Sequence, residues 1–285
     1  MAKPKIAVLG SVNLDLIARA PKLPAPGETV TGATLTQAPG GKGANQALAA
    51  RRLGADVALI ARIGADAYGE QALALLRAEG VDLAACVTDP NLATGLAMIV
   101  VDPAGHNQIT VASGANAAMR LDDAPLPTAD GLICQLEVPV TTVAQAAQRH
   151  RGFFCLNIAP VHDLPATLVA RADLIVANEG EARDAAAMLQ GYGGLLAITK
   201  GGDGAQLRRA GDIIAATAAP RVDVVDTTGA GDCFTAALTV RLLAGDTPAA
   251  ALLYACAAGA CAVRKPGAQP ALPGDAEVRA LLAAQ

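Results

Sequence analysis

Val225-Asp226-Thr227-Thr228-Gly229-Ala230-Gly231-Asp232 is the stretch around which this chain is organised. The apolar run 222–225 leads into it and predicts a strand, while the pattern of 233–244 after it predicts a helix. A helix start presents unpaired backbone N–H groups and the positive end of the helix dipole, so this turn is suited to binding an anion. Its glycines let a ligand approach the backbone without meeting a Cβ atom.

The carboxylate of Asp232 falls in or next to the first turn of that predicted helix and has two interpretations. It can be a helix N-terminal carboxylate that interacts favourably with the dipole. It can also be a general base that faces a phosphoryl group held by the neighbouring amides. The stretch by itself is compatible with both, and the remainder of the chain has to separate them.

The composition indicates an α/β protein with a small-molecule partner. Of the 285 residues 53% are hydrophobic, but only 2% are aromatic and none is Trp, so the core consists mainly of Ala, Val, Leu and Ile. The net charge of −4 is dispersed, which provides no basic surface for nucleic acid. No linker-like or low-complexity segment divides the chain, and we expect a single domain over 1–285.

The sequence predicts no membrane partner and a cytoplasmic location. The longest apolar run, 248–263, is shorter than the roughly 20 residues that a spanning helix needs, and it predicts a buried helix. Met1 to Lys5 lead into only five apolar residues, too few for a signal peptide. The six cysteines form no C-x-x-C pair and are expected to be buried thiols, and the three histidines lack metal-ligand spacing.

Apolar runs and helical patterns alternate along most of the chain, which predicts a parallel sheet with helices on both faces. Strands are expected at 6–9, 57–60, 132–136, 153–158, 174–177 and 195–199. Helices are expected at 47–53, 69–79, 141–149, 164–171 and 181–189. The Pro- and Gly-rich segment 21–32 predicts a loop or an excursion from the sheet, and 95–101 with 108–112 predicts a hairpin.

Polar residues end several of these strands, and ligands bind beyond the carboxyl ends of parallel strands. They are Asn13, Asp15, Glu137, Asn178, Thr199 and the stretch 226–232. A second glycine-rich turn, 39–46, opens a helix and contains Lys42. It does not fit a P-loop, so it is either a tight turn with a solvated lysine or part of a site. Each residue alone could be a cap or turn residue, but together on one rim they favour a site.

At this point the sequence resembles the ribokinase family of carbohydrate kinases. The similarity runs from Ile6 to about Pro273 and is carried by 10–15 (Gly-Ser-Val-Asn-Leu-Asp), 26–29 (Pro-Gly-Glu-Thr), 40–45 (Gly-Gly-Lys-Gly-Ala-Asn), 178–181 (Asn-Glu-Gly-Glu) and 226–232 (Asp-Thr-Thr-Gly-Ala-Gly-Asp). The resemblance implies a three-layer α/β/α sandwich with a mostly parallel central sheet and a small β-sheet lid formed by about 13–39 and 93–112. This chain differs from the family in one respect: its segment between Asn178 and Thr199 is shorter than is usual in family members.

The resemblance further implies ATP-dependent transfer of the γ-phosphoryl group to the O5 hydroxyl of ribose. Asp232 matches the catalytic base, and the N–H groups of Gly229, Ala230 and Gly231 match the anion hole. The positions that match the sugar site are Asn13, Asp15, Gly41, Lys42, Gly43, Asn45, Glu137 and Asp232. Those that match the nucleotide site are Asn178, Glu181, Thr199, Lys200, Gly201, Gly202, Gly204 and Gly231.

The family also uses metal ions and a dimer contact. Glu181 matches the residue that organises Mg²⁺ and its waters. Family members bind a monovalent cation, usually K⁺, mostly through backbone carbonyls, and the matching positions are Asp226, Thr228, Ala262, Lys265, Gly267 and Ala271. The lid implies closure over the sugar, which excludes water, and a homodimer formed through the lids.

Other functions compatible with this sequence remain open. One is a related kinase for deoxyribose, another sugar or a nucleoside. A second is a catalytically silent regulator that binds sugar or nucleotide, although such a protein would be expected to lose the base or an anion-hole glycine, which this chain retains. A dinucleotide-binding oxidoreductase is disfavoured because no Gly-x-Gly-x-x-Gly follows the first strand.

Overall fold

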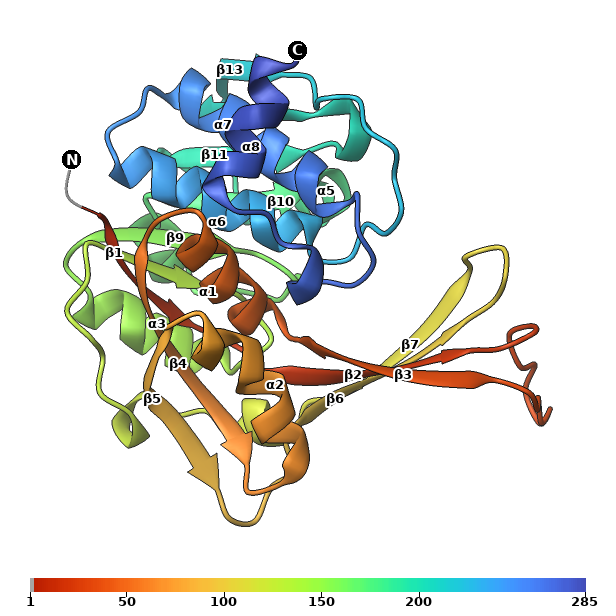
Figure 1. Cartoon of the computed structure of the whole chain (residues 1–285). Helices are drawn as coiled ribbons and strands as arrows, with labels where there is room; N and C mark the ends of the chain where they lie inside the picture. Colours follow the sequence, from red (N-terminus) through yellow and green to blue (C-terminus); the bar gives the residue numbers. More distant parts are fainter. Residues whose placement is uncertain (1–2) are drawn as a thin grey trace.

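The computed structural model describes residues 3–285, so the expectation about the start of the chain at Met1 and Ala2 lies outside the described residues. A central nine-stranded sheet forms the body, and a smaller sheet projects from it (Figure 1). The central strands, in the order in which they lie side by side, are β13 (Asp212–Thr217), β12 (Ala205–Arg209), β11 (Leu195–Thr199), β10 (Leu174–Asn178), β9 (Phe153–Asn157), β8 (Gly131–Cys134), β1 (Lys5–Leu9), β4 (Asp56–Gly64) and β5 (Asp82–Asp89).

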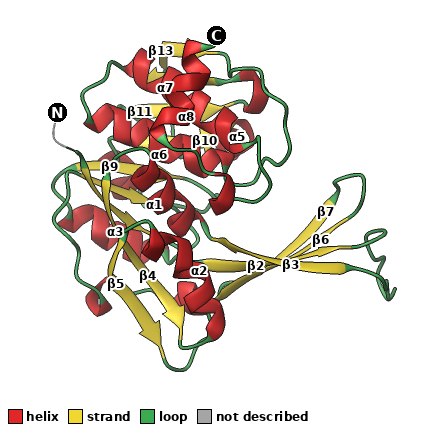
Figure 2. Ribbon diagram, in the orientation of Figure 1, coloured by secondary structure: helices red, strands yellow, loops and turns green. Residues whose placement is uncertain are grey.

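Strands β11 to β5 of this order run parallel, and β12 and β13 add an antiparallel edge. Helices lie on both faces of the sheet (Figure 2). They are α1 (Lys42–Arg52), α2 (Ala67–Ala78), α3 (Val140–Arg149), α4 (Ala166–Arg171), α5 (Glu179–Asp184), α6 (Ala230–Leu243), α7 (Pro248–Ala262) and α8 (Asp275–Ala283). The expected mostly parallel α/β/α architecture is therefore confirmed.

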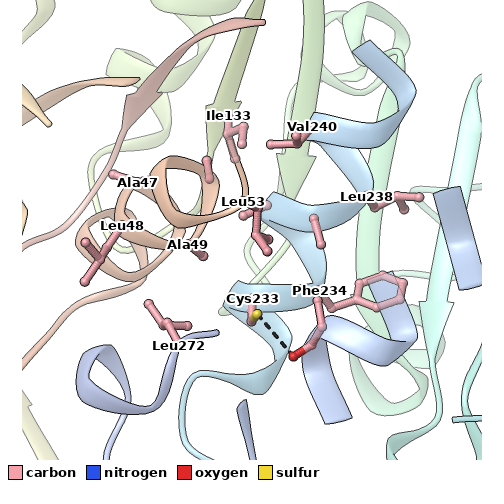
Figure 3. Packing of buried hydrophobic residues seen from close by; sticks show 14 of the residues in the cluster. Ala47, Leu48, Ala49, Leu53, Ile133, Cys233, Phe234, Leu238, Val240 and Leu272 are labelled. Atoms are coloured by element: carbon pink, nitrogen blue, oxygen red, sulfur yellow. Dashed lines mark hydrogen bonds between the residues drawn. The ribbon is translucent and has the colours of Figure 1, made fainter. Parts of the chain in front are cut away.

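Two hydrophobic cores, one on each face of the sheet, hold the layers together. Alternate side chains of β1 point to opposite faces, so Ile6 and Val8 enter one core while Ala7 and Leu9 enter the other. The first core packs against α1, α2, α6, α7 and α8, and the second against α3, α4 and α5. Small residues such as Ala47 and Ala49 let α1 lie close to α6, whose Cys233 and Leu238 belong to the same core (Figure 3).

The projecting sheet has the strand order β3 (Thr34–Gly40), β2 (Asn13–Arg19), β6 (Gly95–Val101) and β7 (Asn107–Ala112). It contains the predicted hairpin, because β6 and β7 pair antiparallel. It also explains the excursion after the first strand, since the Pro- and Gly-rich segment connects β2 to β3. We refer to this four-stranded sheet as the lid.

The structure corrects several expectations about individual elements. The run 222–225 is not a strand: Val224 and Val225 are more than half exposed, and the backbone N–H of Val225 donates to the Val263 carbonyl outside the sheet. Helix α5 ends at Asp184 rather than at 189, and it is followed by turns. Three strands that the apolar pattern did not predict, β5, β12 and β13, complete the sheet.

The remaining predicted helices are present within a few residues of their expected ends. The apolar run 248–263 forms the buried helix α7, and the pattern 233–244 forms α6, which begins three residues earlier at Ala230. Among residues 3–285, no helix is both long and apolar enough to cross a membrane. Five of the six cysteines are buried and Cys86 is half-buried.

Candidate functional site

Helix α1 begins where the first strand of the body turns into the lid, and its first turn is tightly packed there. Gly41 precedes the helix with a φ of 88°, a conformation that favours glycine. Gly43 lies against the backbone after β1: a Cβ on it would stand 2.5 Å from the Gly10 carbonyl carbon and 2.6 Å from the Ser11 nitrogen. The spacing of Lys42, Asn45 and Gln46 then places these three side chains on one helix face.

Helix α6 begins beside that face and brings Asp232 to it. Both oxygens of the buried Asp232 carboxylate accept from amides of α1: Nδ2 of Asn45 donates to Oδ2 at 2.9 Å, and Nε2 of Gln46 donates to Oδ1 at 2.9 Å. The charge of Asp232 is also the main cause that raises the pKa of Lys42, against the opposing effect of burial and with help from Glu137 and Glu181. The Asp232 carboxylate is thus held by two side chains of α1.

The start of α6 is open to an incoming anion. Gly229 is the residue before the helix and has a φ of 78°, and within the described residues no side chain caps it. A Cβ placed on the exposed Gly231 would meet no atom within 4 Å, so the space above the first turn is free. The N–H of Ala230 donates to the Thr227 carbonyl at 3.3 Å. The first turn of α6 thus has open space above it, while the Ala230 N–H, one of the predicted anion-hole donors, is bonded to Thr227.

Two carboxylates from different elements face the same space from the lid side. Asp15 lies on β2, and burial, together with the nearby charge of Glu137, raises its pKa to about 6. Glu137 follows β8, accepts from the Ser11 hydroxyl, and accepts from the backbone N–H of Lys42 at 3.1 Å. The Asp15 carboxylate also lies against Gly40, where a Cβ would come within 2.5 Å of Oδ2. Hydroxyl groups of a sugar can be held between such acceptors and the ammonium group of Lys42.

Asn13 sits at the root of the lid, and its amide orientation is set by Asn116. Nδ2 of Asn116 donates to Oδ1 of Asn13 at 2.8 Å and to the Val12 carbonyl at 3.1 Å, while its Oδ1 accepts from the Val12 N–H at 2.9 Å. Gly95 leaves room for this contact, because a Cβ there would overlap both amides. Oδ1 of Asn13 is therefore occupied, and its NH2 group is the part that remains as a donor for a ligand.

The predicted nucleotide residues lie at the ends of two neighbouring strands. Asn178 and Thr199 are directly paired across β10 and β11. Asn178 and Glu181 form a capping box at the start of α5, with the Asn178 N–H donating to Glu181 and the Glu181 N–H donating to Asn178, both at 2.8 Å. Lys200 and Gly204 bracket a single 3-10 turn, Gly201–Asp203, that includes Gly202. Glu181 is close enough to the centre for its charge to act on Lys42.

Asp226 joins two loops beside the start of α6. Its Oδ1 accepts from the N–H of Thr228 at 2.9 Å and from the Thr228 hydroxyl at 2.6 Å, and its Oδ2 accepts from the N–H of Gly267 at 2.8 Å. Burial opposes ionisation, but these hydrogen bonds lower the pKa of Asp226 overall. Of the other predicted cation positions, Ala262 ends α7, Ala271 ends the 3-10 turn Gln269–Ala271, and the Lys265 ammonium is paired with Glu277 at 2.8 Å.

A cavity of about 610 Å³ lies elsewhere, at the opposite end of the parallel strands. Phe153 and Leu195, the first residues of β9 and β11, contribute to its wall together with Tyr192 and Arg209. None of the residues predicted to bind sugar, nucleotide or cation lines it. The candidate site is instead the region enclosed by the first turns of α1 and α6 and the root of the lid.

The sequence patterns missed five polar residues that the structure brings into or behind this site: Ser11, Gln46, Asn116, Gln135 and Asn157. Gln46 and Asn157 bond to one another at 3.1 Å behind Asp232. A signal for two of them was present, because Gln46 lies one helical turn after Lys42 and Asn157 interrupts the apolar run 153–158. Asn116 follows the lid hairpin without any periodic pattern that would single it out.

Known proteins resemble this chain in both sequence and fold. Residues 3–275 match the pfkB family of carbohydrate kinases. A ribokinase of Haemophilus influenzae is 36% identical, covering 94% of this chain and 95% of its own, and one of Bacillus subtilis is 36% identical, covering 97% and 99%. A solved structure of Arabidopsis thaliana ribokinase complexed with ribose and ATP superposes with a TM-score of 0.89 at 29% identity, covering 99% of both chains. The chain therefore belongs to the pfkB family of carbohydrate kinases.

Proposed function

We propose that this chain is an ATP-dependent ribokinase, which phosphorylates the O5 hydroxyl of D-ribose and releases D-ribose 5-phosphate and ADP. The observation that carries the proposal is the buried Asp232 carboxylate, held by Asn45 and Gln46, next to the open first turn of α6. Transfer of a phosphoryl group to a hydroxyl requires a base next to an anion-binding turn. The relatives named ribokinase and the ribose and ATP complex of the Arabidopsis protein support the same assignment.

The proposed division of roles follows the geometry. Asp232 accepts the proton of the sugar hydroxyl, and the backbone N–H groups at the start of α6 stabilise the negative charge on the transferred group. Asn13, Asp15, Lys42, Asn45 and Glu137, with the backbone of Gly41 and Gly43, hold the sugar. The NH2 group of Asn13 donates to it, while the carboxylates of Asp15 and Glu137 accept from its hydroxyls.

The proposal also includes nucleotide, Mg²⁺ and a monovalent cation. ATP is bound between Asn178, Thr199 and the turn 200–204, with its phosphates toward Gly231. Glu181 would hold Mg²⁺ through water, and the ion would supply positive charge next to the phosphates. K⁺ is held beside Asp226 by carbonyl groups of the loops that this carboxylate joins.

A substrate screen tests this function directly. ADP formation is measured with ribose, deoxyribose, fructose and several nucleosides, with K⁺ present or replaced by Na⁺ or Li⁺. We expect the highest kcat/KM with ribose and a clear loss of activity without K⁺. A preference for a nucleoside or another sugar would replace ribose in the proposal, activity indifferent to the cation would remove K⁺, and no turnover with any acceptor would favour the silent regulator.

Replacing Asp15 with asparagine is expected to weaken sugar binding and to change its pH dependence. Loss of hydrogen bonds to a charged acceptor should raise the ribose KM about 10- to 100-fold, with the ATP KM little changed. Because the pKa of Asp15 is raised to about 6, kcat/KM for ribose in the unaltered enzyme should fall as the pH drops below that value. In Asp15→Asn, this fall of kcat/KM at low pH should be absent. An altered ATP KM with an unaltered ribose KM would contradict the assignment.

The same variant has a predicted effect on stability with a defined sign. The folded pKa of Asp15 lies above its ordinary value of 3.8, so the folded state binds more protons than the unfolded state between about pH 4 and 6. Its contribution to the free energy of unfolding therefore falls as the pH rises through that window. Asp15→Asn should be more stable than the unaltered protein at pH 7, measured by urea unfolding, and the difference should shrink toward pH 4.

We further propose that the chain is cytoplasmic and forms a homodimer through the lid. Both faces of the lid carry exposed apolar side chains: Leu35 and Met98 lie on one face, and Ile109 and Val111 lie on the face that carries Asp15. A second lid would cover this apolar surface. Sedimentation equilibrium should give a dimer for the unaltered chain and a shift toward monomer for Ile109→Lys. A monomeric unaltered chain would contradict this part of the proposal.

A further inference from the structure

A row of buried amide side chains lies directly behind Asp232. Gln46, on α1, and Gln135, which follows β8, are both 0% exposed, and Asn157, which ends β9, is 6% exposed. Three elements that are far apart in the sequence thus converge on the side of the carboxylate away from the ligand space. We propose that Gln46 is a positioning residue for the catalytic base: its amide group fixes the rotation of the Asp232 carboxylate. This inference rests on the proposed role of Asp232.

The hydrogen bonds fix which end of the Gln46 amide faces Asp232. Its Nε2 donates to Oδ1 of Asp232 at 2.9 Å and to Oδ1 of Asn157 at 3.1 Å. Its Oε1 accepts from Nε2 of Gln135 at 2.6 Å. Rotating the amide by 180° would place Oε1 against two acceptor oxygens and the NH2 group against a donor. Gln46 therefore presents hydrogens, not a lone pair, to the base.

The orientation of this row is set from its far end by backbone. Nδ2 of Asn157 donates to the Val176 carbonyl at 3.1 Å, which leaves Oδ1 of Asn157 as the acceptor for Gln46. Val176 belongs to β10, so the central sheet itself determines the direction of the donors. The carboxylate is consequently held on a rigid support. This matters because a displacement of the base by about 1 Å can lower the rate about 100-fold.

Neutral donors suit a base better than a charged partner. Hydrogen bonds to the carboxylate favour its ionised form, while an adjacent arginine or lysine in direct contact would lower its affinity for the proton much further. Asn45 donates to Oδ2 and Gln46 donates to Oδ1, so each oxygen uses one lone pair and retains a second lone pair for the sugar hydroxyl. Since Gln46 is fully buried, it acts on the reaction only through Asp232.

Other ionisable groups face Asp232 and have to be held constant in a test. Lys42 of α1 interacts with it, and Glu137 and Glu181 interact with Lys42. Asp15 of the lid interacts with Glu137, and the buried Cys233 follows Asp232 on α6. All of them are retained when Gln46 alone is changed. A difference in pH dependence between the two proteins therefore reports on Gln46.

The experiment is the pH profile of kcat/KM for Gln46→Met, which keeps the side-chain length and removes the donors. We expect the acid limb to move to higher pH by about one unit and kcat to fall by about tenfold or more, with both KM values changed less than threefold. The control is Thr142→Val, which removes a buried 2.7 Å hydrogen bond to the Met119 carbonyl that involves none of the residues in contact with Asp232, and it should leave the acid limb in place. An unmoved acid limb in Gln46→Met would overturn the inference.

A double variant separates this inference from the proposed function. If Gln46 acts through Asp232, adding Gln46→Met to Asp232→Asn should cause no further loss of kcat, whereas an additive loss would contradict the inference. Full activity of Asp232→Asn alone would instead refute the role of the base. Where Gln46→Met fails to fold, Gln46→Glu supplies the same readout. This variant retains an acceptor for Gln135, and the added negative charge next to Asp232 should move the acid limb upward even further.

Discussion

Replacing Asp232 with asparagine is expected to lower kcat by about 10²- to 10⁴-fold, the usual contribution of a general base. The variant has nearly the same shape, so α6 and its contact with α1 should persist. An amide cannot accept the proton of the sugar hydroxyl at neutral pH, and one of its two polar atoms becomes a donor. Rates are measured by ADP formation with saturating ribose and ATP, and binding of both is measured separately by calorimetry.

The control for this prediction is a carboxylate of similar type on a helix outside the site. Asp66 begins α2 and accepts from the Gly69 N–H at 2.9 Å and from Thr94, so Asp66→Asn changes a capping carboxylate that has no hydrogen bond to Asp232 or its partners. It should lose some stability and retain kcat. If Asp232→Asn retained kcat to the same degree, Asp232 would be an ordinary helix N-terminal carboxylate, the first interpretation that its sequence position allowed.

Replacing Gly43 with alanine is expected to damage both folding and catalysis. Its Cβ would lie within 2.7 Å of three backbone atoms of Gly10 and Ser11, and backbone cannot rotate away as a side chain can. The first turn of α1 must therefore shift, which should cost about 1–3 kcal/mol in the free energy of unfolding. A shift of about 1 Å at Lys42 and Asn45 should lower kcat/KM for ribose by about 100-fold.

The measurement combines urea unfolding with steady-state kinetics. Gly193→Ala is the matched control, since a Cβ there would meet no atom within 4 Å and its φ is not positive. It should match the unaltered protein in both assays. A Gly43→Ala variant with normal stability and normal ribose kinetics would mean that α1 adjusts without moving the sugar residues.

The sequence predicted the layers of the fold well because buried parallel strands are continuous apolar runs. Residues 6–9 and 174–177 are of this kind, and both are strands of the central sheet. The antiparallel edge was missed for the opposite reason. Strand β13 is largely exposed and β12 carries Arg208 and Arg209, so neither has the pattern of a covered strand. The strand predicted at 222–225 was wrong because the sequence does not distinguish exposed valines, such as Val224 and Val225, from buried ones.

The candidate site was predictable where residues end strands or begin helices, and not where pairing across the fold creates it. Asn13, Glu137 and Asn178 could be collected from strand ends alone, and the structure places them on the rim expected for a parallel sheet. The link between Gln46 and Asn157 depends on the position of α1 beside β9. Local patterns contain no information about such a contact, because it joins residues 111 positions apart.

The distance along the chain between Asp232 and its partners also bears on how the protein is made. The hydrogen bonds from Asn45 and Gln46 to Asp232 span 187 and 186 residues. Helix α1 therefore cannot contact α6 until most of the polypeptide has left the ribosome. Contacts of such sequence separation form late, after the more local β1, β4 and lid pairings. Asp232 is therefore the last of the proposed sugar-site residues to be synthesised, and phosphoryl transfer by the proposed mechanism requires α6 to dock on α1.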